Sequence, residues 1–236
     1  MARKRHLIVI PALNEEKTIG TVIRNAKEYA PYADILLIND GSTDNTAAIA
    51  RQEGVRVIDL PFNLGYGAAL QTGFRFAERH GYDFVITMDA DGQHVLSSVE
   101  NLLAAMEHEA ADVVIGSRFL KEGYRPGIPR AIGIWLFSKI AKMYTGATIT
   151  DPTSGFQLLN RKAFSYLSQG DNYPLDYPDV NIIMALHRKK FRVVEAPVIM
   201  VKSPDKKSMH SGLRPVLYVI KMTLAVIMVM MGRERE

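Results

Sequence analysis

Two acidic residues stand two positions apart in the segment TMDADGQH at residues 87–94. They follow an apolar run typical of a buried strand, and carboxylates held this close repel each other unless a cation lies between them. Carboxylate oxygens with open coordination positions suit Mg²⁺ or Mn²⁺, which keep water and diphosphate oxygens as their other ligands. Asp89 and Asp91 are therefore candidate metal ligands. The alternative is an ordinary Asp-Gly turn after a strand, because Asp is common in turns.

A second polar segment, NDGSTD at residues 39–44, also follows an apolar run. Asp40 can accept hydrogen bonds from a nucleoside base or ribose, and Gly41 allows the backbone to approach a ligand closely. Alternatively, Ser42 or Thr43 caps the helix that follows. The two interpretations are compatible, so the segment indicates where a ligand would lie more than which ligand it would be.

Two more segments mark the starts of helices. In PALNEE (residues 11–16), Pro11 ends a strand and Asn14 can cap a helix that carries two Glu residues in its first turn. In NLGYGAAL (residues 63–70), the third glycine of a dinucleotide-binding pattern is replaced by Leu70, and the segment follows the third strand rather than the first. A nicotinamide-dependent oxidoreductase is therefore a poor fit. The helix N-terminus at Gly67 can still help to hold a phosphate.

A doubly wound α/β scaffold is expected to position these segments. Apolar runs alternate with helical patterns, which predicts a parallel sheet covered on both faces, with ligands at the carboxyl ends of the strands. The predicted strands are 6–10, 35–38, 55–58, 84–88 and 113–115, and the predicted helices are 15–29, 45–52, 67–80 and 98–108. Beyond residue 117 we expect a loop at 123–129, helices at 132–144 and 179–188, and strands at 156–160 and 192–196.

The C-terminal part of the chain is expected to form a separate element. We predict one domain over residues 1–201, a mobile basic loop over 202–213 and an apolar helix over 214–236. The apolar run of that helix, residues 216–231, is shorter than the ~20 residues that span a bilayer. The basic residues before it favour a helix lying in a membrane interface or docked on a partner. Packing on the domain's own core is the alternative.

Composition narrows the class of protein. The 236 residues include no cysteine, which excludes disulfides, thiolate metal sites and cysteine nucleophiles. A net charge of +4 is too small to indicate a nucleic-acid partner. The N-terminal apolar run is too short for a signal peptide, so we expect the protein to act in the cytoplasm.

Six motifs in a fixed order carry a resemblance to a known family. The motifs are PALNEE, NDGSTDNT, NLGYGAALQTGF, MDADGQH, GSRF and DPTSGFQLLNR. Together they resemble the family-2 glycosyltransferases of GT-A fold, in particular the branch of dolichol-phosphate mannose synthases and polyprenyl-phosphate sugar transferases. The resemblance covers about residues 6–200. It implies a GT-A fold with a doubly wound, mainly parallel sheet; the C-terminal apolar helix predicted above lies beyond the resemblance.

The resemblance also implies an activity. It implies an inverting hexosyltransferase that uses Mg²⁺ or Mn²⁺ and moves one sugar from a nucleotide-diphospho-sugar to polyprenyl phosphate. The chain lacks the Q-x-x-R-W signature of processive synthases, which favours a single transfer. The S-R-x-x-N-like acceptor pattern is missing between Arg130 and Asp151. Two alternatives therefore stay open: transfer to a saccharide or lipid-linked glycan during cell-envelope polysaccharide assembly, and a nucleotide-binding subunit of a membrane complex.

Roles for single residues follow from the resemblance. The nucleotide site would comprise Pro11, Ala12, Glu15, Asp40, Gly67 and Asp89, and the metal site would comprise Asp89, Asp91 and Gln93. The acceptor would lie against Arg118, Arg130, Thr153 and Ser154. Arg118 would join the two acidic residues in catalysis, and Asp179 would be the base if the acceptor were a hydroxyl. The alternatives are an exposed loop charge for Arg130 and a helix cap for Asp179. We expect peripheral association with the inner face of the membrane, through lipid or a small membrane-protein partner.

Overall fold

A computed structural model of the chain describes residues 4–121, 128–175, 178–201 and 224, with side chains omitted for 128–132. The predicted loop 202–213 lies outside the described residues, as does the predicted helix 214–236 except for Leu224. Within the described part of the chain, no helix is long and apolar enough to cross a membrane.

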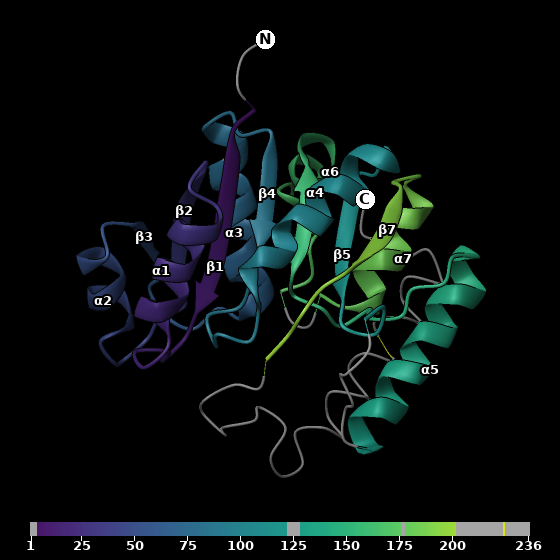
Figure 1. Cartoon of the computed structure of the whole chain (residues 1–236), viewed down its shortest axis with the longest axis horizontal. Coiled ribbons are helices and arrows are strands. Elements are labelled where there is room, and N and C mark those ends of the chain that lie inside the picture. Colours follow the sequence, from purple (N-terminus) through teal and green to yellow (C-terminus); the bar gives the residue numbers. More distant parts are fainter. Residues whose placement is uncertain (1–3, 122–127, 176–177, 202–223, 225–236) are drawn as a thin grey trace.

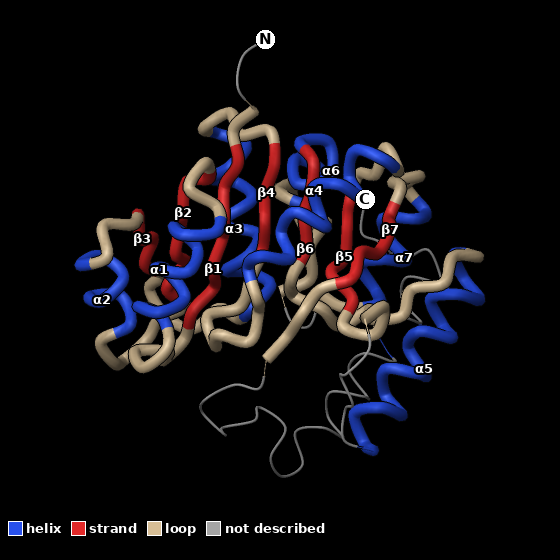
Figure 2. The backbone as a smooth tube through the Cα atoms, viewed as in Figure 1, coloured by secondary structure: helices blue, strands red, loops and turns tan. Residues whose placement is uncertain are grey.

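A seven-stranded sheet forms the centre of the molecule (Figures 1 and 2). Its strands are β1 (His6–Ala12), β2 (Ala33–Asn39), β3 (Arg56–Asp59), β4 (Phe84–Thr87), β5 (Val113–Ser117), β6 (Gln157–Asn160) and β7 (Val193–Pro197). The spatial order is β3-β2-β1-β4-β6-β5-β7. Strand β6 pairs antiparallel with both of its neighbours, and the other pairs are parallel. The predicted doubly wound, mainly parallel sheet is confirmed.

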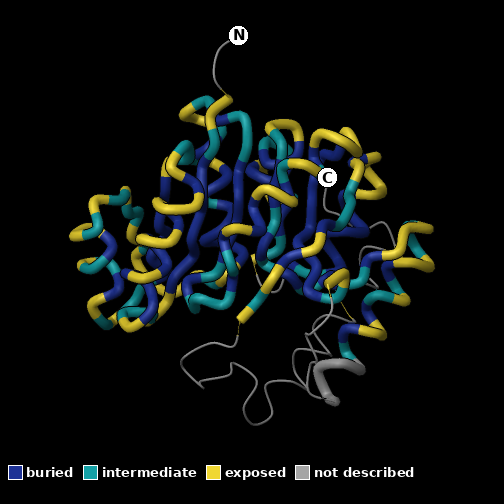
Figure 3. The backbone as a smooth tube through the Cα atoms, in the orientation of Figure 1, coloured by how far each residue is buried: buried dark blue, intermediate teal, exposed yellow. Residues whose placement is uncertain are grey.

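Helices cover both faces of the sheet (Figure 1). The covering helices are α1 (Ile19–Tyr29), α2 (Thr46–Gln52), α3 (Tyr66–Arg79), α4 (Val99–His108), α6 (Arg161–Leu167) and α7 (Val180–Arg188), with a 3₁₀ turn at Leu96–Ser98. Helix α5 (Ile128–Thr145) lies to the side of the sheet and packs against α7. Side chains alternate between the two faces along each strand. In β1, Leu7 and Val9 therefore pack in a core with α3, α6 and α7, whereas Ile8 and Ile10 pack in a second core with α1 and α4. The buried strands between the two layers are dark blue in Figure 3.

Successive strands are added first on one side of β1 and then on the other. Strands β2 and β3 extend the sheet on one side of β1, and β4 begins the other side. Where the direction of growth reverses in this way, the loops after the two adjoining strands run apart and leave a crevice at the carboxyl ends of those strands. Because β6 runs against the others, the loop before it, residues 151–156, lies at the same edge (Figure 2). Segments from both halves of the chain therefore meet there.

One predicted helix start is wrong, and one predicted helix cap is not made. The first helix begins at Ile19 rather than at residue 15, because residues 13–18 form turns in which Asn14 has a left-handed φ of 57°. The second helix begins at Thr46, and neither Ser42 nor Thr43 caps it; the Asp44 carboxylate accepts the Thr46 N–H at 3.0 Å. The hydrogen bonds that Asn14, Ser42 and Thr43 make instead join these two loops to each other.

Helix α6 and the antiparallel direction of β6 were not predicted. The helix is short, and it begins where the side chain of Asn160 accepts the Ala163 N–H at 2.9 Å. A single asparagine at the end of a strand is a weak signal, because the same residue is common in turns.

Candidate active site

The two acidic residues predicted as metal ligands follow β4 directly. An Asx-type turn is present: the Asp91 carboxylate accepts the Gln93 N–H at 3.0 Å, and Gly92 between them has a left-handed φ of 74°. The alternative of an Asp-Gly turn thus describes the local backbone correctly. It does not remove the carboxylates as ligands, since a carboxylate offers about four acceptor positions and the turn uses one.

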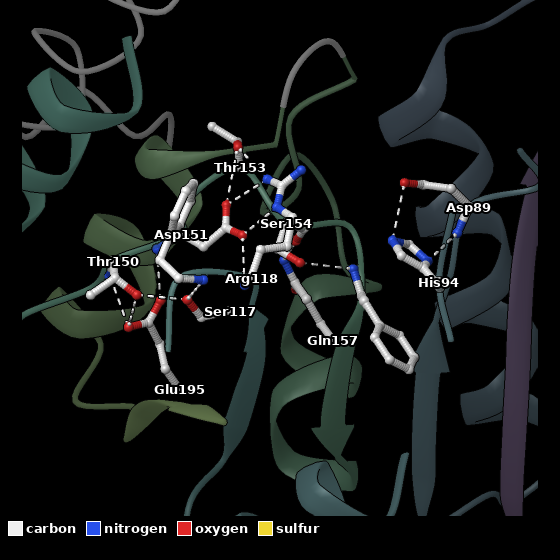
Figure 4. A network of polar contacts seen from close by, with 12 residues as sticks. Asp89, His94, Ser117, Arg118, Thr150, Asp151, Thr153, Ser154, Gln157 and Glu195 are labelled. Carbon is white, nitrogen blue, oxygen red and sulfur yellow. Dashed lines mark hydrogen bonds and ion pairs between the residues drawn. The ribbon is translucent and has the colours of Figure 1, made fainter. Parts of the chain in front are cut away.

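Three groups surround the Asp89 carboxylate, two of them from distant parts of the chain. The Tyr66 hydroxyl, at the start of α3, donates a hydrogen bond to Oδ1 at 2.9 Å. The Nε2 atom of His94 lies 3.6 Å from Oδ2 (Figure 4). On a third side is Gly155: a Cβ atom there would lie 2.8 Å from Asp89 Oδ1 and 2.6 Å from the Tyr66 hydroxyl. The site therefore has room for glycine only at residue 155.

His94 holds Asp89 from the buried side. Its Nδ1 atom accepts the backbone N–H of Asp89 at 3.1 Å, which places the proton of the neutral ring on Nε2, the nitrogen that faces the carboxylate. Burial lowers the pKa of His94, and the negative charges of Asp89 and Asp91 oppose this. The ring is fixed by stacking on Phe156, with centroids 4.9 Å apart. His94 was not predicted as a site residue, although it belongs to the same motif.

Arg118 forms a buried ion pair with Asp151. Its Nε and one terminal nitrogen each lie 2.6 Å from a carboxylate oxygen, and that terminal nitrogen also reaches the Thr153 hydroxyl at 3.2 Å (Figure 4). The exposed fraction of Arg118 is 3%, and that of Asp151 is 0%. The pair therefore ties the end of β5 to the loop before β6. The predicted contact of Arg118 with an acceptor stays a prediction.

Glu195 on β7 fixes the other end of that loop. Its carboxylate accepts the N–H groups of Thr150 and Asp151 at 2.8 Å, together with the Thr150 hydroxyl at 2.9 Å. Burial raises the pKa of Glu195, and these hydrogen bonds act in the opposite direction. At the far end of the loop, the Gly155 carbonyl accepts a hydrogen bond from Thr87 on β4. The loop that contacts Asp89 is thus bound to β4, β5 and β7.

Asp40 and Gly67, both predicted in the nucleotide site, have internal partners. The Asp40 carboxylate accepts the N–H groups of Leu64 and Gly65 at 2.7 and 3.0 Å, one on each oxygen. The Gly67 N–H donates to the carbonyl of Leu175 at 3.0 Å, and a Cβ atom on Gly67 would lie 1.9 Å from the Pro174 oxygen. Gly67 is therefore needed for close packing at the start of α3, and its N–H is already engaged.

Asp179 is the N-cap residue of α7, and its side chain makes no capping hydrogen bond to the helix. Desolvation raises the pKa values of both Tyr66 and Tyr173, and the negative charges of Asp89 and Asp179 raise them further. Asp179 is therefore close enough to act on the surroundings of Asp89.

The remaining predicted residues occupy the same edge where the structure describes them. Pro11 and Ala12 are buried at the end of β1, Glu15 and Gln93 are half-buried, and the side chain of Arg130 lies outside the described part. Beside the Arg118 loop, a groove combines apolar side chains with two lysines; it is lined by Phe119, Ile134, Trp135, Ser138, Lys139, Lys142 and Thr150. The exposed fraction of Trp135 in this groove is 57%.

A divalent cation fits the chemistry of this site. Asp89 and Asp91 are half-buried and supply hard oxygen atoms, the ligands that Mg²⁺ and Mn²⁺ prefer. Glycine at residue 155 keeps a Cβ atom from crowding the Asp89 carboxylate, which would lie 2.8 Å from it. No group of three or more His, Asp or Glu side chains that could hold a metal ion occurs within the described ranges.

Comparison with known proteins gives consistent results. The model of the family described as "Glycosyl transferase family 2" matches residues 7–167. An uncharacterized protein of Methanocaldococcus jannaschii is 38% identical over 161 residues, which are 67% of this chain and 64% of that protein, just under two thirds of its length. The polyprenol monophosphomannose synthase of Mycolicibacterium smegmatis is 30% identical over 224 residues, 89% of this chain and 82% of that enzyme.

A solved structure shares the fold. Glucosyl-3-phosphoglycerate synthase from Mycobacterium tuberculosis, in complex with Mn²⁺, UDP-glucose and phosphoglyceric acid, superposes with a TM-score of 0.68. The two chains are 19% identical, and the match covers 94% of this chain and 80% of that one. The predicted GT-A fold is thereby confirmed.

Proposed function

This chain belongs to glycosyltransferase family 2, and we propose that it transfers one sugar from a nucleotide-diphospho-sugar to polyprenyl phosphate with inversion at the anomeric carbon. One observation carries the proposal: within this family's fold, Asp89 and Asp91 follow the β-strand next to the topological switch of the sheet. That is where nucleotide ligands bind in open α/β sheets.

The donor half of the proposal rests on the acidic pair. Asp89 and Asp91, with the Gln93 side chain, would hold Mg²⁺ or Mn²⁺. The metal would neutralise the charge that develops on the departing nucleotide diphosphate. The nucleoside would lie over the ends of β1 and β2, against Pro11, Ala12, Glu15 and Asp40. Asp40 would then have two tasks, since it already holds the backbone at Leu64 and Gly65.

The acceptor half rests on similarity and on the groove beside Arg118. A relative that is 30% identical over 89% of this chain is a polyprenol monophosphomannose synthase. The groove offers aromatic and aliphatic side chains for an isoprenoid and two lysines for a phosphate. Thr153, Ser154, Arg118 and Arg130 are the proposed contacts of the acceptor's head.

A phosphate acceptor simplifies the chemistry. Near neutral pH it is already an anion, so the bond from its oxygen to the anomeric carbon can form without a general base. The nucleotide diphosphate leaves from the opposite face of the sugar. The protein's tasks are then to hold both substrates in line and to exclude water. Asp179 would be needed as a base only for a hydroxyl acceptor.

The experiment that tests the proposal combines a panel of nucleotide sugars with defined acceptors. The purified chain is incubated with Mn²⁺, each UDP- or GDP-sugar, and undecaprenyl phosphate, dolichyl phosphate or a lipid-linked saccharide. Release of nucleotide diphosphate and the mass of the extracted lipid are measured. An acid-labile lipid carrying one sugar supports the proposal. A lengthened saccharide, or no transfer with any pair, contradicts it.

Replacement of Gly155 by alanine should lower kcat/KM at least about tenfold. The new Cβ atom would overlap both the Tyr66 hydroxyl and the Asp89 carboxylate, so one of them must move. Nucleotide-diphosphate release measures the effect. Gly133→Ala on α5 is the matched control, since a Cβ atom there meets nothing within 4 Å. Equal activity of the two variants would contradict the tight fit at residue 155.

The C-terminal segment is proposed to bring the enzyme to the inner face of the membrane. The proposal rests on the apolar run at residues 216–231 and the basic residues before it. We expect the full chain to sediment with vesicles of phosphatidylcholine and phosphatidylglycerol, and a chain ending at residue 213 to stay in the supernatant. Equal sedimentation of the two would return residues 214–236 to the alternative of a helix packed on the core.

A further inference from the structure

Tyr66 is the side chain that reaches Asp89 from the opposite half of the nucleotide-binding edge. It lies at the first position of α3, and its hydroxyl donates to Asp89 Oδ1 at 2.9 Å. The function proposed above gives Tyr66 no task.

The backbone before Tyr66 is held in place by another site residue. Gly65 has a left-handed φ of 102°, and its N–H donates to one oxygen of Asp40 while the N–H of Leu64 donates to the other. Asp40 is 4% exposed, so this anchor is buried. On the other side of the tyrosine, Gly67 is pinned by the Leu175 carbonyl. Tyr66 therefore stands on a segment fixed at both ends.

The hydrogen bond leaves Asp89 able to bind a cation. A carboxylate oxygen has two lone pairs, and Tyr66 occupies one of those on Oδ1. His94 Nε2 lies 3.6 Å from Oδ2 on the buried side, and the Tyr66 hydroxyl fixes the carboxylate at Oδ1. Groups that hydrogen-bond to metal ligands in this way set their orientation, and their loss commonly costs 10–100-fold in metal affinity.

We propose that Tyr66 is a positioning residue that orients the Asp89 carboxylate for the divalent cation and couples it, through the segment anchored by Asp40, to the nucleoside side of the site. This inference rests on the proposed function, because it requires a metal at Asp89. It assigns a role to the NLGYG motif, which the proposed function leaves without one.

Binding of Mn²⁺ alone to the full chain tests the inference. Free Mn²⁺ is measured by electron paramagnetic resonance as MnCl₂ is added to the wild-type protein, to Tyr66→Phe and to Tyr82→Phe. The Tyr82 hydroxyl donates to Asp34 at 2.7 Å at the opposite edge of the sheet, so Tyr82→Phe loses the same kind of hydrogen bond away from the site. Melting temperatures of all three proteins are recorded in parallel.

We expect Tyr66→Phe to bind Mn²⁺ about tenfold more weakly than the wild type and Tyr82→Phe to bind it equally well. If Tyr66→Phe binds Mn²⁺ as tightly as the wild type does, the role of Tyr66 is refuted and the metal site stands. If affinity falls equally in both variants, the effect is one of general stability, and the role is likewise refuted. If the wild-type chain takes up no Mn²⁺, the proposed metal site itself fails.

Discussion

Asp91→Asn should lower kcat/KM for sugar transfer about a thousandfold while leaving the fold intact. The substitution preserves the shape of the side chain and an oxygen that can accept the Gln93 N–H, so the turn at Gly92 can persist. It removes the negative charge that a divalent cation requires. A cation contributes several kcal/mol to stabilising a departing diphosphate, and each ~1.4 kcal/mol corresponds to a factor of ten in rate.

The measurement is nucleotide-diphosphate release at saturating Mn²⁺, with circular dichroism to check the fold. Asp34→Asn is the matched control, because the side chain of Asp34 is 65% exposed and lies at the other end of the strands. The control should retain wild-type kcat/KM. Wild-type activity in Asp91→Asn would exclude a metal-binding role for this residue. Asp89→Ala should lower kcat/KM as severely as Asp91→Asn. If only Asp89→Ala did so, its effect would have to come from the lost contacts of Asp89 with Tyr66 and His94.

Asp151→Ala should lower the free energy of unfolding by about 3–5 kcal/mol. The substitution leaves the Arg118 guanidinium charged and buried without the carboxylate that holds two of its nitrogens. A buried ion pair adds little net stability, but removing one partner exposes the full cost of burying the other. Urea unfolding followed by circular dichroism gives the free energy.

Two further variants separate this cause from general damage to the loop. Glu109→Ala breaks the pair with Arg192, in which both side chains are more than half exposed, and it should cost no more than about 1 kcal/mol. The double variant Arg118→Met with Asp151→Leu removes both charges and should recover most of the lost stability. A cost below about 1 kcal/mol for Asp151→Ala would contradict the buried pair as the element that holds the loop.

The sequence was sufficient to predict the scaffold and the edge of the sheet on which the candidate site residues lie. Short continuous apolar runs such as residues 7–10, each bounded by turn residues, indicate strands buried on both faces, and the polar residues after them mark the carboxyl edge. Asp89 and Asp91 could be selected for the same reason: two charges at the end of a buried strand need a counterion.

The partners of these residues could not be predicted from the sequence. Tyr66, Asp89 and Gly155 meet only because β6 is inserted, antiparallel, between β4 and β5, and no local pattern encodes that insertion. Arg118 and Asp151 are each typical of solvated residues when read alone, and only the fold brings them together. Glycine before a strand, as at residue 155, is equally common in plain turns.

The segment between β5 and β6 can change in length and sequence without disturbing the sheet. Strand β5 ends at Ser117, and the chain returns at Thr150, whose hydroxyl lies 2.6 Å from that of the same serine. The chain therefore leaves the sheet after Ser117 and returns beside it at Thr150. Lengthening such an excursion costs little entropy, since the cost grows only with the logarithm of its length. Under the function proposed above, evolution could thus exchange α5 to fit a new acceptor while the proposed donor site stays the same.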